Sequence, residues 1–121
     1  MDWVGDGYPP YNGFRKLTTV KLADTVSTIG TGAFAHCNAL SSIDFGNGLT
    51  KIGDYAFSVC EGLKRVSLPS SLTSVGANAF RGTALTSVTI PKSVKSIGSE
   101  AFGYSGWETD YGFLPVNGFT I

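Results

Sequence analysis

A repeating unit of about 23 residues constrains this chain more than any other feature. Blocks with the same apolar pattern begin at Leu17, Leu40, Leu63 and Leu85, at steps of 23, 23 and 22 residues. A unit this short cannot bury an apolar face by itself, so successive units must stack and share one core. The 121 residues are therefore expected to form a single structural domain.

Each block opens with apolar residues at its first, fourth and sixth positions, as in Leu17, Val20 and Leu22. The last two are separated by the period of a strand with one buried face. The other blocks hold Leu40/Ile43/Phe45, Leu63/Val66/Leu68 and Leu85/Val88/Ile90 at these positions. A glycine or proline then follows in three of the four blocks. We therefore expect every block to begin with a short strand that stops at this point.

The second half of each block holds another apolar pair, then a glycine and an Ala-Phe dipeptide. The glycines are Gly30, Gly53, Gly76 and Gly98, and the dipeptides are Ala33-Phe34, Ala56-Phe57, Ala79-Phe80 and Ala101-Phe102. A glycine that recurs in one position indicates either a positive φ or a lack of room for a side chain. A small residue beside a large one suits a tight helical turn, and we expect the phenylalanines to stack in a column.

The pattern extends weakly beyond the four full blocks. Residues 7–14 match the register of residues 30–37, and residues 116–121 match that of residues 85–90. About five parallel strands, roughly 4.8 Å apart, are expected in one right-handed coil. We divide the domain into a partial N-terminal repeat or cap (1–16), four repeats (17–102), and an aromatic insertion with a final capping strand (103–121). The chain is also expected to be a piece of a longer protein.

One stretch strongly resembles the BspA-type, or treponemal-type, leucine-rich repeat: Leu63-Lys-Arg-Val66-Ser-Leu68-Pro69-Ser-Ser-Leu72-Thr-Ser-Val75-Gly76-Ala-Asn-Ala79-Phe80. The resemblance is strongest over residues 17–102, although Thr83 and Ser105 stand where the family pattern has cysteine. It implies a leucine-rich-repeat solenoid of the α/β horseshoe type, rich in strands, with short helical turns. It also implies a secreted or surface-attached protein, mainly bacterial, that adheres to host proteins, other cells or matrix. A fold alone does not fix a function.

The charge balance excludes some classes of partner. Nine Lys and Arg residues balance nine Asp and Glu residues, so no net positive charge attracts nucleic acid or an anionic membrane. No apolar run approaches the roughly 18 residues that cross a bilayer, so we expect no membrane insertion. The N-terminus lacks the features of a secretory signal, so an extracellular or cell-surface location requires an export signal outside this stretch.

The two cysteines occupy equivalent positions in adjacent blocks. A disulfide between Cys37 and Cys60 is geometrically feasible if these positions stack. We favour two free, buried thiols, because Phe14, Thr83 and Ser105 fill the same position and cannot form a bridge. The pair also lacks the close spacing and further ligands of a zinc motif.

Neither catalysis nor a bound cofactor or metal is predicted. His36 is the only histidine, and as the neighbour of Cys37 it is badly placed to serve as its base. The acidic residues are scattered over expected surface positions, and we interpret them as charges that favour solubility. They include Asp24, Asp44, Asp54, Glu61 and Glu100.

Stacked strands place their outward residues in columns on one face, which we expect to be the concave binding face. The candidate residues are Thr19, Lys21, Ser42, Asp44, Arg65, Ser67, Ser87 and Thr89. Their hydroxyl and charged groups can hydrogen-bond a partner, although hydroxyl and β-branched residues also suit any exposed strand. No aromatic residue of the kind that anchors interfaces lies in these columns.

Aromatic residues gather instead near the ends of the chain, where Tyr104, Trp107 and Tyr111 precede the last expected strand. Exposed rings there would stack on a sugar or anchor a partner protein. An open solenoid also needs a cover over each end of its core, and we favour this capping role.

The sequence thus predicts a non-catalytic module of an extracellular or cell-surface protein that mediates protein–protein interaction or adhesion. Its partner is expected to be a protein, with no role for nucleic acid. A glycan-binding module, or a structural spacer in a larger secreted modular protein, is the alternative.

Overall fold

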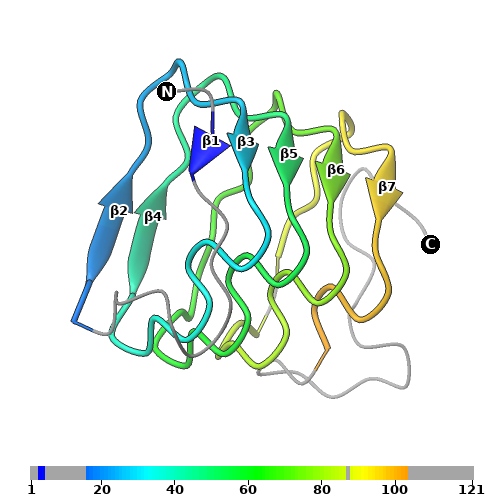
Figure 1. Cartoon of the computed structure of the whole chain (residues 1–121). Coiled ribbons are helices and arrows are strands. Elements are labelled where there is room, and N and C mark those ends of the chain that lie inside the picture. The colour runs from blue at the N-terminus through cyan, green and yellow to red at the C-terminus, as the bar shows by residue number, and fades with distance from the viewer. Residues whose placement is uncertain (1–2, 5–15, 87, 104–121) are drawn as a thin grey trace.

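The computed structural model describes residues 3–4, 16–86 and 88–103 (Figure 1). Its strands are short: β1 Trp3–Val4, β2 Thr19–Lys21, β3 Thr28–Ile29, β4 Ser42–Asp44, β5 Lys51–Ile52, β6 Ser74–Val75 and β7 Ser96–Ile97. They form a five-stranded parallel sheet in the order β1-β3-β5-β6-β7 and a two-stranded parallel sheet, β2-β4. Successive turns of the chain therefore lie side by side, which confirms the expected solenoid.

The five-stranded sheet joins equivalent residues of successive turns. Thr28 pairs with Lys51, Lys51 with Ser74, and Ser74 with Ser96. Figure 1 shows this sheet as a row of arrows, with the β2-β4 pair apart from it. At one edge β1 pairs with β3 through Trp3 and Thr28. A strand therefore precedes the first full block.

The location of this sheet corrects one expectation. We expected the five strands in the segments that open each block, including residues 116–121. The five-stranded sheet is built instead from β1 and from the second apolar pair of each turn. Of the opening segments, only those that contain β2 and β4 pair as strands among the described residues. Residues 116–121 lie outside the described part of the chain.

The repeated glycine lets neighbouring turns approach closely beside this sheet. A Cβ on Gly53 would lie 2.8 Å from the carbonyl oxygen of Ile29, and one on Gly76 would lie 2.5 Å from the amide nitrogen of Asp54. The described glycines with positive φ lie elsewhere, at Gly32, Gly46 and Gly82. Of the two explanations for the repeated glycine, the lack of room for a side chain is therefore the correct one.

In the Ala-Phe segment, backbone N–H groups donate alternately to a carbonyl in their own turn of the solenoid and to one in the next turn. Ala33 donates to Gly30 within its own turn, at 3.2 Å, whereas Phe34 donates to Ala56 in the next turn, at 2.8 Å. Non-glycine residues with positive φ also interrupt any helical run: His36, Tyr55, Val59, Asn78 and Glu100. The expected helical turns are therefore single four-residue turns, each closed by one hydrogen bond between residues i+3 and i, and no helix occurs in the described residues.

The core contains the expected column of phenylalanines. The rings of Phe34 and Phe57 stack with centroids 5.4 Å apart, those of Phe57 and Phe80 at 5.2 Å, and those of Phe80 and Phe102 at 5.3 Å. Their planes are within 9° of parallel. All four side chains are buried, and they lie among the leucine, isoleucine and valine residues of the repeat. Phe57 and Phe80 are therefore each covered by a ring on both faces.

Replacing a central ring should destabilise the whole stack. Phe80→Ala removes a fully buried ring that packs on two neighbours, so we expect the free energy of unfolding to fall by about 3–5 kcal/mol. Lys51→Ala, at an exposed position of β5, should change it by less than about 0.5 kcal/mol. Denaturant unfolding followed by circular dichroism measures both values. A Phe80→Ala loss as small as that of Lys51→Ala would contradict the role of the stack.

Two glycines should respond differently to the same added methyl group. Gly76→Ala places a Cβ against the Asp54 backbone, so we expect a loss of about 3 kcal/mol. Gly82 has a φ of 78° but its Cβ would lie 3.4 Å from the nearest atoms, so Gly82→Ala should cost only about 1–2 kcal/mol. Thermal or denaturant unfolding of the two variants compares these costs. The reverse order would show that crowding between turns is not what requires Gly76.

Candidate functional site

The candidate binding face is built on β2 and β4. In-register pairing places Thr19 beside Ser42 and Lys21 beside Asp44. All four residues are exposed, while Leu22 and Phe45 at the strand ends are buried in the core. The structure thus places the predicted face residues of the first two turns next to one another. The cation of Lys21 and the anion of Asp44 lie on the same face of adjacent strands.

Backbone pairing on this face stops after β4. Leu22 donates to the carbonyl of Asp44 at 2.9 Å, but in the described residues no backbone hydrogen bond joins residues 43–47 to residues 65–71. Phe45, which is larger than the equivalent Leu22, packs edge-on against Phe57 with ring centroids 5.8 Å apart. The third and fourth turns therefore do not continue this sheet, and the face is hollowed instead.

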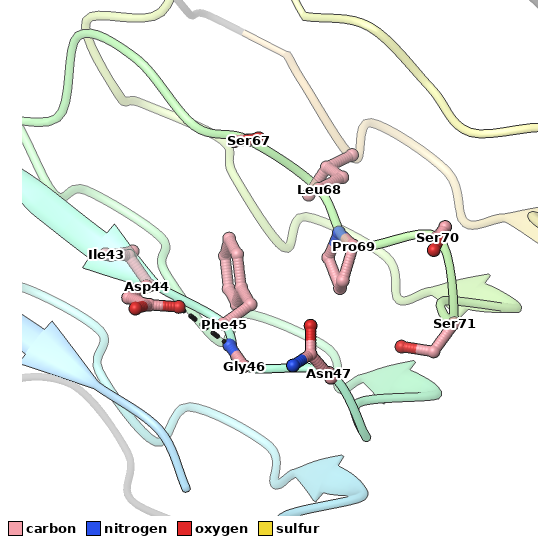
Figure 2. A pocket seen from close by; sticks show the side chains of 10 residues that line it. All are labelled: Ile43, Asp44, Phe45, Gly46, Asn47, Ser67, Leu68, Pro69, Ser70 and Ser71. Carbon is pink, nitrogen blue, oxygen red and sulfur yellow. Dashed lines mark hydrogen bonds between the residues drawn. The ribbon is translucent and has the colours of Figure 1, made fainter. Parts of the chain in front are cut away.

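The first depression, here called the Asp44 hollow, lies between residues 43–47 and residues 67–71 and has a volume of about 520 Å³. Figure 2 shows the ring of Phe45 between the two segments, with the Asp44 carboxylate at one side and Asn47 at the other. Asp44 accepts a hydrogen bond from the backbone N–H of Gly46 at 3.0 Å, so the carboxylate is held at the rim. This hollow thus combines an acidic rim with an apolar floor.

The second depression, here called the Arg65 hollow, lies between the third and fourth turns and has a volume of about 680 Å³. It is lined by Lys64, Arg65, Val66, Ser67, Leu68, Ser70, Thr86, Val88, Thr89 and Pro91. Three of the predicted face residues, Arg65, Ser67 and Thr89, thus meet at one depression. Ser67 and Ser70 also line the Asp44 hollow, so the two depressions are adjacent.

The remaining predicted site residues cannot be placed. Ser87 of the candidate face, and the aromatic residues Tyr104, Trp107 and Tyr111, lie outside the described residues. The same holds for most of the segments proposed as N-terminal and C-terminal caps. The capping and sugar-stacking roles of the aromatic residues therefore stay predictions.

Sequence reasoning missed several residues that line the hollows. Lys64, Ser70 and Thr86 were not candidates, because a regular strand would expose only alternate residues. The segment from residue 64 to 70 is not a strand, so consecutive residues such as Lys64 and Arg65 reach the same depression. The prolines at 69 and 91 were the available signal, since a residue without an N–H group seldom lies within a paired strand.

The acidic residues do more than favour solubility. Asp24 accepts a hydrogen bond from the backbone N–H of Asn47 in the next turn at 3.0 Å, and Asp54 accepts one from Ala77 at 2.9 Å. These carboxylates therefore tie adjacent turns together. Within the described ranges, no group of three or more His, Cys, Asp and Glu side chains is placed to hold a metal ion.

Cys37 and Cys60 form no disulfide and are fully buried, as the sequence analysis favoured. The Cys60 thiol donates to the carbonyl oxygen of Phe34 at 3.1 Å. A hydrogen bond with Cys37, together with burial, raises the pKa of the Cys60 thiol above its ordinary value. A protonated thiol shielded from solvent is a poor nucleophile, so this arrangement suits a structural residue.

The raised pKa of Cys60 should make stability depend on alkaline pH. Above roughly pH 8.5 the thiol ionises in the unfolded chain but stays protonated in the folded one, so the folded state loses relative stability. The same hydrogen bond lowers the pKa of Cys37, so the proper reference lacks both thiols. We expect the unfolding free energy of the wild type to fall, by up to about 1.4 kcal/mol per pH unit, relative to that of Cys37→Ala/Cys60→Ala. Denaturant unfolding under reducing conditions from pH 7.5 to about 10 tests this. Parallel pH profiles of the two proteins would contradict it.

Comparisons with known proteins agree with the repeat. The family model described as "BspA type Leucine rich repeat region" matches residues 10–108 with six copies. None of the curated proteins matches the chain. In the described residues, no helix is long and apolar enough to cross a membrane.

Solved structures share the same fold. A leucine-rich repeat protein from Bacteroides ovatus is 41% identical, with a TM-score of 0.73, over 80% of this chain and 25% of its own. A leucine-rich repeat protein from T. pallidum is 38% identical, with a TM-score of 0.71, over 73% of this chain and 42% of its own. A leucine-rich cell surface protein from Faecalibacterium prausnitzii is 25% identical, with a TM-score of 0.51, over 83% of this chain and 38% of its own. The chain therefore spans less than half the length of each of these proteins.

Proposed function

Because this chain belongs to the BspA-type leucine-rich repeat family, we propose that it is a non-catalytic module that binds a protein partner through its candidate binding face. We place this module in an extracellular or cell-surface protein that works by adhesion. Repeat proteins of this kind offer extended surfaces on which side chains of successive turns act together. The protein partner and the role in adhesion are both part of this proposal.

The proposal rests on the exposed side chains of the first three turns, here called the array, and on the two hollows beside them. Lys21, Asp44 and Arg65 are exposed, charged and directed to one face, and exposed hydroxyl residues accompany them. Interfaces between proteins combine polar rims with depressions that exclude water. The five-stranded sheet instead carries Thr28, Lys51, Ser74 and Ser96 in register.

Two further observations support a binding role. Both cysteines are buried and the histidine, His36, is half-buried. The Cys60 thiol donates a hydrogen bond to the carbonyl of Phe34, and the backbone N–H of His36 donates one to the carbonyl of Ser58. The Faecalibacterium prausnitzii relative is named a cell surface protein, which supports a surface location for the present chain.

The test is to compare capture of labelled cell-surface proteins by the wild type and by a variant of the face. Lys21→Ala/Asp44→Ala/Arg65→Ala removes the charged groups of the array, so we expect retained proteins to fall roughly tenfold or more. Mass spectrometry identifies the retained proteins, and titration with a purified one gives the change in Kd.

The matched control is Lys51→Ala/Ser74→Ala/Lys95→Ala, which alters side chains of the other sheet and its flank. It should retain the same proteins as the wild type. If the wild type retains nothing above background, or if both triple variants bind as the wild type does, the candidate face is not a binding surface.

A further inference from the structure

We propose that the Arg65 hollow is the principal contact point of the candidate binding face and takes an acidic, extended peptide segment of the partner. This inference rests on the proposed binding function and names the chemistry of the partner. It follows from the charge of the hollow, from its floor, and from the unpaired backbone along one wall.

The hollow carries two cations and no acidic residue. Lys64 and Arg65 line it from the third turn, and both are exposed. At equivalent positions the first and second turns hold Thr18/Thr19 and Ser41/Ser42. The formal net charge of the chain is zero, so this positive charge is local. A local pair of cations attracts a carboxylate group at one position without making the protein a general binder of polyanions.

The rest of the lining suits a carboxylate that must give up part of its water shell. Hydroxyl groups that can donate to it surround the hollow: Ser67, Ser70, Thr86 and Thr89. The floor is formed by the buried side chains of Leu68 and Val88, with half-buried Val66 and Pro91 beside them. These apolar side chains can contact the aliphatic part of an acidic side chain while its carboxylate faces the exposed cations. The volume of about 680 Å³ is within the usual range for ligand pockets.

The backbone of the third turn favours a peptide over a saccharide. In the part of the chain that the structure describes, no backbone–backbone hydrogen bond is made by residues 65–68. Their N–H and C=O groups can pair with an extended chain, as when a peptide adds a strand to a sheet edge. A saccharide cannot supply this repeating pattern of donors and acceptors. The hollow also lacks an aromatic side chain on which a sugar would stack.

The neighbouring Asp44 hollow makes the recognition selective. It shares Ser67, Leu68 and Ser70 with the Arg65 hollow, but its only charged residue is Asp44. An acidic side chain is therefore attracted to one depression and repelled by the adjacent one. The position of the acidic group in the partner segment, and not only its presence, should decide binding.

The experiment measures binding of a fluorescein-labelled oligoglutamate peptide to the full chain by fluorescence anisotropy. Oligoglutamine of the same length and a heparin-derived oligosaccharide are the comparison probes. We expect the wild type to bind oligoglutamate more tightly than either of them. Lys64→Ala/Arg65→Ala should weaken this binding roughly tenfold or more, because it removes both charge-assisted donors.

Two further variants make the result specific. Lys51→Ala/Lys95→Ala removes the same number of cations away from the face and should leave binding nearly unchanged. Thr89→Glu keeps both cations but adds a negative charge to the lining, and it should also weaken binding of oligoglutamate. Unchanged melting temperatures establish that each variant is folded.

Several outcomes would overturn the inference. The first is an equal loss of oligoglutamate affinity in Lys64→Ala/Arg65→Ala and in Lys51→Ala/Lys95→Ala. The others are no binding of oligoglutamate by the wild type, and tighter binding of the heparin oligosaccharide than of the peptide. If the peptide assay fails while the face variant still loses its captured proteins, the proposed function stands and only the acidic peptide is excluded. If both fail, the candidate face itself is excluded.

Discussion

Stacking between neighbouring turns is the interaction on which the rest of the structure depends. Phe57 is covered by Phe34 on one side and by Phe80 on the other, and the same turns exchange backbone hydrogen bonds. Stacked rings 5.2–5.4 Å apart match closely the spacing of about 4.8 Å between paired strands, so one stack satisfies both kinds of contact. Close approach in turn leaves no room for a Cβ at Gly53 or Gly76.

The candidate site exists where this regular contact is interrupted. The five-stranded sheet is fully paired from turn to turn and therefore offers no free backbone between its strands. On the other face, pairing stops beyond β4, and the residues that follow line two depressions. Family membership accounts for the stack but not for the side chains around these depressions, since a fold can host many functions. Lys64, Arg65 and Asp44 are properties of this particular chain.

Much of the fold could be predicted from the repeat, because identical positions in identical units must stack. The phenylalanine column and the buried, free cysteines followed from that rule. That rule did not predict which apolar segment of each block forms the main sheet, since both segments have residues that suit a strand. The positive φ at Tyr55 and Val59 was not predicted either, although glycine at the equivalent positions of other turns, Gly32 and Gly82, was an available signal. The hollows depend on how far two segments separate, which spacing along the chain does not encode.

The pitch of the aromatic column also limits how a linear partner can lie on this protein. The stacked rings of successive turns lie 5.2–5.4 Å apart, whereas side chains on one face of an extended peptide repeat about every 6.6 Å. A peptide that runs parallel to the solenoid axis therefore falls out of step with the rings after one or two contacts. The two repeats come back into phase only after about five ring spacings, which match four repeats of the peptide. For such a partner, lengthening the array would add surface without adding equivalent contacts, so the proposed face would gain specificity from single irregular turns rather than from the number of copies.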